Sequence, residues 1–129
     1  PDSVNAIDWT LKNKNAAQFD YYRELIALRR AHPAFRMIST EDIAKNIVFD
    51  KIQSPNVVSY SIRNHANGDE WREIKLVFNG SDAPFVAKVP KGEWTVIARN
   101  GEIKAAGLGT SKGGSVVVEP VSALILARK

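Results

Sequence analysis

The sequence of 129 residues contains no cysteine. This absence excludes disulfide scaffolds, thiol catalysis and cysteine metal sites, and it leaves the redox compartment open. No stretch approaches the ~18 consecutive apolar residues that a membrane-spanning helix needs, so we expect no membrane segment. A start methionine and a charged-then-apolar leader are also missing, and we therefore expect Pro1 to be a cut end.

Positive charge is not concentrated in any block. The 18 basic and 14 acidic residues give a net charge of +4, with no Lys/Arg run longer than two. Nucleic-acid-binding proteins usually gather such charge on one face, so no nucleic-acid partner is expected. The only histidines, His32 and His65, lack partners at metal-binding spacing, and no metal or cofactor is predicted. The glycine-rich stretch 107–114 lacks a Gly-Lys-Ser/Thr ending and is predicted to be a flexible loop.

The first third of the chain has helical periodicity. Residues 1–14 are rich in Asp, Asn, Ser and Pro and are predicted to form a loop. From Ala16, apolar residues recur every three or four positions and predict a long helix, with Asn15 as its N-cap and Pro33 as its end. The members of this stripe are Phe19, Tyr22, Leu25, Ile26 and Leu28. A short helix is expected at 39–47, where Ser39 and Asp42 form a capping-box pattern.

Beyond residue 46 the pattern changes to the period-two alternation of strands. Asn67-Gly68 is a strong hairpin signal, because both residues tolerate positive φ. The fold class is therefore predicted as mainly β: an antiparallel, Greek-key-like sandwich of about eight strands, preceded by one long helix and a short one. The expected strands are 47–52, 56–63, 71–78, 85–89, 93–98, 103–106, 116–119 and 122–127.

Carboxylates and tryptophans are the residues with possible roles in sugar chemistry. Asp20 and Glu24 lie one helical turn apart near Arg23, which favours an ion-paired helix face, and no catalytic pair is predicted. Trp71 and Trp94 fall within or beside alternating strands, which favours core packing over a sugar-stacking platform. Trp9 has no periodic neighbours to bury it, so its role stays open.

Two early stretches, PDSVNAIDW and FDYYRELIALRRAHPAFRM, resemble the segment after the last barrel strand of type I pullulanases, starch-debranching enzymes of the α-amylase superfamily. The later stretches VVSYSIR, IKLVFNGS, VPKGEWTVIARNGEIKAAG and SVVVEPVSALILA are similar to that family's C-terminal sandwich. The resemblance implies that residues 1–38 are the rim loop and last helix of a truncated (β/α)8 barrel. It implies that residues 39–129 are the C-terminal β-sandwich domain.

The resemblance also implies which functional residues this chain contains. The catalytic carboxylates of the family lie on barrel strands four, five and seven, upstream of Pro1, so catalytic residues are not expected here. Asp2, Asn5, Asp8 and Trp9 would contact substrate in the parent enzyme as hydrogen-bonding or stacking groups. An equally good alternative is that Asp8 and Trp9 only attach the loop to the barrel and do not contact substrate.

The resulting hypothesis is a non-catalytic domain that stabilises the barrel of an enzyme hydrolysing α-1,6-glucosidic bonds in pullulan, amylopectin or glycogen-derived α-glucans. The expected partners are the upstream barrel and, in the parent, the α-glucan. The alternative is an autonomous α-glucan-binding module that uses Trp9, Trp71 or Trp94. Loss of the barrel would expose an apolar face of the helix and favour self-association. The compartment is not fixed, although a secreted, periplasmic or cell-surface parent would suit the family.

Overall fold

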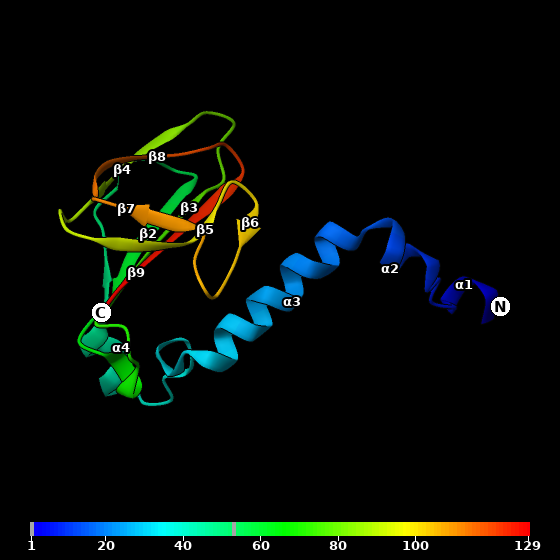
Figure 1. The fold of residues 1–129 in the computed structure, drawn as a ribbon, viewed down its shortest axis with the longest axis horizontal. Helices are drawn as coiled ribbons and strands as arrows, with labels where there is room; N and C mark the ends of the chain where they lie inside the picture. Colours follow the sequence, from blue (N-terminus) through cyan, green and yellow to red (C-terminus); the bar gives the residue numbers. More distant parts are fainter. Residues whose placement is uncertain (1, 53) are drawn as a thin grey trace.

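The computed structural model describes residues 2–52 and 54–129. Figure 1 shows a β-sandwich from which a long helix leads away toward the N-terminus. The α-helices are α1 (Asp2–Asn5), α2 (Thr10–Lys14), α3 (Ala16–Ala31) and α4 (Thr40–Asn46), with short 3-10 turns η1 (Pro33–Arg36) and η2 (Ala66–Gly68). The strands are β1 (Ile47–Phe49), β2 (Val57–Ile62), β3 (Glu73–Asn79), β4 (Phe85–Val89), β5 (Trp94–Arg99), β6 (Glu102–Ile103), β7 (Gly109–Ser111), β8 (Gly114–Val118) and β9 (Ser122–Arg128).

The strands form two sheets. Six strands of the larger sheet follow the order β1-β2-β3-β9-β5-β6, and β7 pairs with β5. The smaller sheet consists of β4 and β8. Every strand pair in the described part of the chain is antiparallel. The predicted mainly-β, antiparallel sandwich with a long and a short helix before it is confirmed.

Each face of the large sheet carries a cluster of buried side chains, because successive side chains of a strand point to opposite sides. On one face, Val77, Leu124 and Leu126 pack against side chains from β4 and β8. On the other face, Ile74 and Ile125 pack against the helical side of the molecule. The sheet is therefore the middle layer between the β4–β8 pair and α3.

Helix α3 uses only part of its apolar stripe to contact the sandwich. Leu28 is buried in the core, and Tyr21 and Leu25 pack against it as half-buried side chains. Phe19, Tyr22 and Ile26 remain exposed. The helix ends before Pro33, as expected. The predicted Asn15 cap is wrong, because its side chain makes no capping hydrogen bond and only its carbonyl accepts, from the Phe19 N–H at 3.0 Å.

Three other local predictions need correction. The predicted loop 1–14 contains the short helices α1 and α2, which exposed polar residues can form where backbone bonding is satisfied locally. The strand expected at 103–106 is only the two-residue β6. Part of the glycine-rich loop is β7, which pairs with β5. Its glycines permit close approach, since a Cβ at Gly113 would lie 2.2 Å from the carbonyl oxygen of Pro90.

Two turns behave as the sequence predicts. Ser39 Oγ accepts the Asp42 N–H at 3.0 Å and so caps α4. The Asn67-Gly68 turn lies between the paired strands β2 and β3, and both residues have positive φ. Of the two histidines, His65 is exposed at this turn, whereas His32 is buried.

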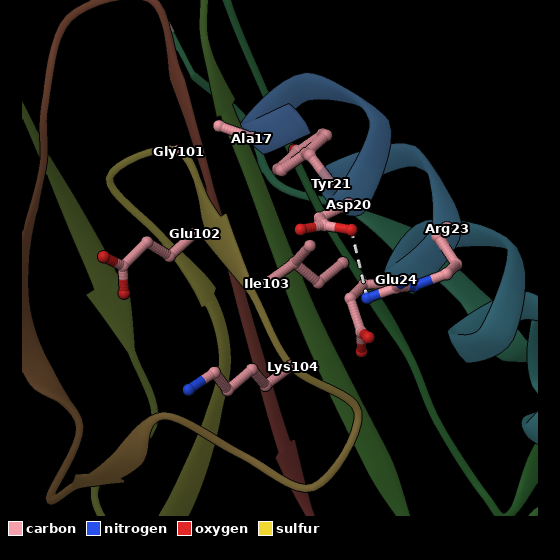
Figure 2. Close-up of a pocket in the computed structure, with 9 residues that line it drawn as sticks. All are labelled: Ala17, Asp20, Tyr21, Arg23, Glu24, Gly101, Glu102, Ile103 and Lys104. Carbon is pink, nitrogen blue, oxygen red and sulfur yellow. Dashed lines mark ion pairs between the residues drawn. The ribbon is translucent and has the colours of Figure 1, made fainter. Parts of the chain in front are cut away.

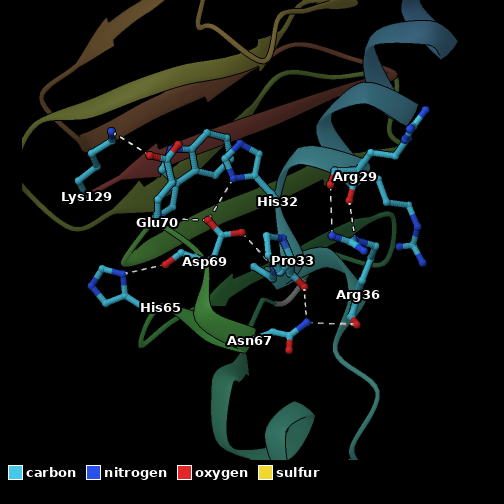
Figure 3. Close-up of polar contacts among 12 residues, drawn as sticks. Arg29, His32, Pro33, Arg36, His65, Asn67, Asp69, Glu70 and Lys129 are labelled. Carbon is cyan, nitrogen blue, oxygen red and sulfur yellow. Dashed lines mark hydrogen bonds and ion pairs between the residues drawn. The ribbon is translucent and has the colours of Figure 1, made fainter.

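The junction of α3 with the sandwich is built around the buried carboxylate of Asp69 (Figure 3). One oxygen lies 3.0 Å from His32 Nδ1 and accepts the Trp71 N–H at 2.9 Å, and the other accepts the Ala34 N–H at 3.0 Å. The His32 ring stacks on Trp71, with ring centroids 3.3 Å apart. Asp69 therefore joins the end of α3, the turn η1 and the start of β3.

Replacing Asp69 with Ala should lower the free energy of unfolding by about 3 kcal/mol, because buried N–H donors lose their acceptor. Urea denaturation would measure the loss. The matched control is Glu70→Ala, which removes the exposed neighbour that pairs with Lys129 and should change stability by less than about 0.5 kcal/mol. Equal effects of the two variants would contradict the role given to Asp69.

Candidate functional site

An apolar groove lies between α3 and the segment that precedes it. This cavity of about 700 Å³ is here called the arm groove. Its walls are formed by residues of α2, of α3 and of the segment between α1 and α2. They include Asp8, Trp9, Leu11, Lys12, Phe19 and Tyr22.

The segment before α3, here called the arm, is held in shape by Asp8. Its carboxylate accepts a free N–H group at the start of α2. Asp8 Oδ1 accepts the Thr10 N–H at 2.9 Å and the Thr10 hydroxyl at 2.6 Å. The side-chain hydrogen bond and then the backbone hydrogen bond from Thr10 hold the pKa of Asp8 below its ordinary value. The carboxylate is therefore charged at neutral pH and fixes the turn that presents Trp9.

Large apolar side chains in and beside the groove are open to solvent. Trp9 is 74% exposed, Tyr22 and Ile26 are each 59% exposed, and Phe19 is 43% exposed. The ammonium group of Lys12 lies 4.5 Å from the centre of the Phe19 ring. Contiguous apolar surface of this kind usually marks a binding surface. The arm groove can bind and orient a partner, but it offers no pair of groups suited to acid–base chemistry.

The structure brings only some of the predicted site residues together. Asp8 and Trp9 line the groove, whereas Asn5 is exposed in α1 and is not among the lining residues. The side chain of Asp2 lies outside the described residues. Leu11 and Lys12 were missed as site residues. The sequence offered no periodic signal for them, because α2 is a short helix with no buried residues.

The opposite side of α3 faces the β5–β6 hairpin across a cavity of about 380 Å³ (Figure 2). Tyr21 of the helix and Ile103 of β6 both line it. Asp20 forms an ion pair with Arg23 at 3.1 Å, so the predicted ion-paired face is confirmed. Tyr21 packs against the sandwich core on this side, and a further open cavity of about 850 Å³ separates α3 from the ends of β3 and β9.

The other two tryptophans are in the core, as predicted. Trp71 is 6% exposed and Trp94 is 1% exposed. Trp94 also donates its indole N–H to the Pro90 carbonyl at 2.9 Å, and the Arg128 guanidinium lies 4.4 Å from its ring centre. Neither ring is available as a platform for a sugar.

Within residues 2–52 and 54–129, no group of three or more His, Asp and Glu side chains is arranged to hold a metal ion. None of the helices described for this chain is both long and apolar enough to cross a membrane.

Known proteins share both the sequence and the shape of this chain. Residues 43–102 match the family model described as pullulanase, all-beta domain. The pullulanase of Bacillus subtilis (strain 168) is 32% identical over 89 residues, which are 69% of this chain and 12% of that protein. The chain belongs to the pullulanase family.

Solved structures agree with this assignment. The pullulanase of Bacillus acidopullulyticus is 35% identical, with a TM-score of 0.91 over 98% of this chain and 15% of its own. The pullulanase of Paenibacillus barengoltzii, solved with maltohexaose and alpha-cyclodextrin, is 30% identical, with a TM-score of 0.78 over 98% of this chain and 19% of its own. This pullulanase all-beta domain thus spans less than a fifth of these relatives.

The hydrogen bonds from Thr10 to the Asp8 carboxylate should depend on pH. Because the folded pKa is lowered from 3.8, the contact stabilises α2 above that value and is lost as the pH falls through the lowered pKa. NMR titration of the Asp8 carboxyl should show this shift, and Thr10→Ala should return the pKa toward 3.8. Thr110→Ala, a change at an exposed threonine in β7, should leave the titration of Asp8 unchanged. An unaltered titration in Thr10→Ala would contradict the assignment.

Proposed function

We propose that this pullulanase domain supports a catalytic barrel that lies upstream in the same protein. The observation that carries the proposal is that α3 is buried on one side only in the described part of the chain. Leu28 anchors one side in the sandwich, while Phe19, Tyr22 and Ile26 face solvent on the other. A barrel packed on this free side would bury the apolar surface, and the domain would stabilise the barrel in return.

The proposal includes a division of the chain at residue 38. Residues 1–38 would be the rim loop and last helix of a (β/α)8 barrel, and residues 39–129 would be the C-terminal sandwich. The rigid connection at Asp69 supports this arrangement, because it holds the end of α3 in a fixed position on the sandwich. A fixed helix can define the position of a barrel relative to the sandwich.

The whole protein would hydrolyse α-1,6-glucosidic bonds in pullulan, amylopectin or glycogen-derived α-glucans, and this domain would not supply the catalytic carboxylates. Family membership supports this activity for the parent. In that setting Asp2, Asn5, Asp8 and Trp9 would lie near the substrate. The exposure of Trp9, at 74%, supports a role in contact with either the sugar or the barrel.

An autonomous α-glucan-binding module is the alternative. Burial of Trp71 and Trp94 removes two of the three residues on which that alternative depends. Trp9 is the remaining aromatic candidate, and Phe19 and Tyr22 line the same groove. The apolar character of this groove fits a protein surface better than a sugar.

The free side of α3 should cause self-association when the chain is studied alone. Sedimentation velocity at increasing concentration should show dimers or larger species, and Phe19→Asp with Tyr22→Asp should restore the monomer. The control is Ile38→Asp, because Ile38 is 96% exposed but lies outside this surface. A wild-type chain that stays monomeric at high concentration would count against the proposed interface.

The domain alone should release no reducing sugar from pullulan or amylopectin, since the proposed catalytic carboxylates belong to the barrel. A reducing-sugar assay would test this, with an intact pullulanase as the positive control. Turnover that copurifies with the folded domain would overturn the non-catalytic assignment.

A further inference from the structure

The sequence contains three Asn-Gly pairs, at positions 67–68, 79–80 and 100–101. Asparagine is among the thermolabile residues of proteins. In an Asn-Gly pair the backbone nitrogen of the glycine can attack the side-chain amide of the asparagine, because glycine has no Cβ to obstruct the approach. The reaction needs water and no enzyme. Its rate depends on how free the two reacting groups are, so the three pairs can be compared within one molecule.

The Asn67-Gly68 pair has both of its reacting groups engaged. The Asn67 amide donates to the Pro33 carbonyl at 2.9 Å and to the Arg36 carbonyl at 3.4 Å (Figure 3). The Gly68 N–H donates to the His65 carbonyl at 2.9 Å. A group that already donates a hydrogen bond must give up that bond before it can react. This pair is therefore protected, although its turn is exposed.

The Asn79-Gly80 pair is protected more completely. Asn79 is 2% exposed and lies in β3, which pairs with β2 on one side and with β9 on the other. Its amide donates to the carbonyls of Val118 and Glu119, each at 3.1 Å. The Gly80 N–H donates to the Asn56 carbonyl at 2.8 Å. Attack at this pair would require opening of an interior strand of the large sheet.

The Asn100-Gly101 pair differs from both. It forms the exposed turn between β5 and β6, and its residues have φ values of 52° and 78°. Within residues 2–52 and 54–129, neither the Asn100 amide nor the Gly101 N–H has a hydrogen-bond partner. A Cβ placed at Gly101 would meet no atom within 4 Å beyond its chain neighbours, so the space around this backbone is open. Both reacting groups are therefore available.

The hairpin that carries this turn is also weakly held. In the described part of the chain two residue pairs join β5 to β6, and the Lys104 N–H adds one bond to the Ile97 carbonyl at 2.9 Å. Local opening of so short a ladder costs less free energy than opening of the seven-residue pairing between β3 and β9. The asparagine side chain in the turn can therefore rotate toward the glycine nitrogen without unfolding of the domain.

We propose that Asn100 is a site of spontaneous deamidation through a succinimide. The Gly101 nitrogen forms a bond to Cγ of Asn100 while the bond from Cγ to Nδ2 breaks, and ammonia leaves with the glycine amide proton. Water then opens the five-membered ring at either of its two carbonyls. One opening gives aspartate at position 100, and the other gives isoaspartate, in which the main chain runs through the side-chain carbon. The net change consumes one water and releases one ammonia, and no electrons are transferred.

Isoaspartate would alter the hairpin beside α3. It adds one methylene group to the main chain, which a two-residue turn with Arg99 opposite Glu102 cannot absorb without a change of register. The next residue of β6 is Ile103, which is 5% exposed and belongs to the core cluster that contains Leu28. Figure 2 shows Gly101 and Ile103 opposite α3, with which they line one cavity. The modification is therefore expected to loosen the contact of α3 with the sandwich.

The test is a time course of peptide mapping by mass spectrometry on the 129-residue chain, kept folded in mildly alkaline buffer. Asn100 should lose its amide about tenfold faster than Asn67 or Asn79, with both acid products at position 100. The matched control is the same chain in urea, where the three pairs should react at similar rates because the structural protection is gone. Asn100→Gln should abolish the reaction at this turn, since the longer side chain cannot form a five-membered ring.

Equal rates at the three sites in the folded chain would overturn the proposal, as would faster reaction at Asn67 or Asn79. A ranking that persists in urea would also overturn it, because the difference would then come from the local sequence and not from the fold. Hydrogen exchange of the Lys104 amide tests the effect on the hairpin. Exchange should rise several-fold in the isoaspartate form and stay unchanged in Asn100→Asp, which adds the charge without the methylene group. Equal exchange in all forms would overturn the effect on the hairpin.

Discussion

The arrangement of this molecule depends on the buried carboxylate of Asp69. Its oxygens accept the N–H groups of Ala34 and Trp71 and contact His32, so segments far apart in sequence share one acceptor. A buried carboxylate is stable only when such donors surround it. The stacked rings of His32 and Trp71 cover this centre from one side. The direction in which α3 leaves the sandwich follows from this one site.

Once α3 is fixed, its two faces acquire different roles. Leu28 is in the core of the sandwich. Tyr22 and Ile26, on another side of the helix, are each 59% exposed. Figure 1 shows α3 leading away from the sandwich. The sandwich thus carries a free apolar helix surface, and the chain spans less than a fifth of the relatives it matches. The proposed barrel interface follows from this asymmetry.

The sequence predicted most strands and α3, because burial imposes a period of two on strands and about 3.6 on helices. It did not predict α2, whose residues are all exposed and whose turn depends on the local Asp8–Thr10 contact. It also gave no sign that Asp69, directly after the Asn67-Gly68 turn, would be buried. Nothing near Asp69 in the sequence indicates that its partners are His32 and Ala34, more than 30 residues earlier. Long-range polar contacts leave no periodic signal.

Two aspartates have different structural roles. Asp8 is exposed and bonds to its neighbour Thr10, among apolar side chains such as Trp9 and Phe19 that a protein surface could bury. Asp50 is oriented by the buried Lys75, in a smaller cavity with one aromatic ring. The hydrogen bonds from Lys75 and Ser59 hold the pKa of Asp50 below its ordinary value, so this carboxylate is charged and offsets the charge of a buried ammonium group. Asp8 fixes a turn at the surface, whereas Asp50 makes the burial of Lys75 possible.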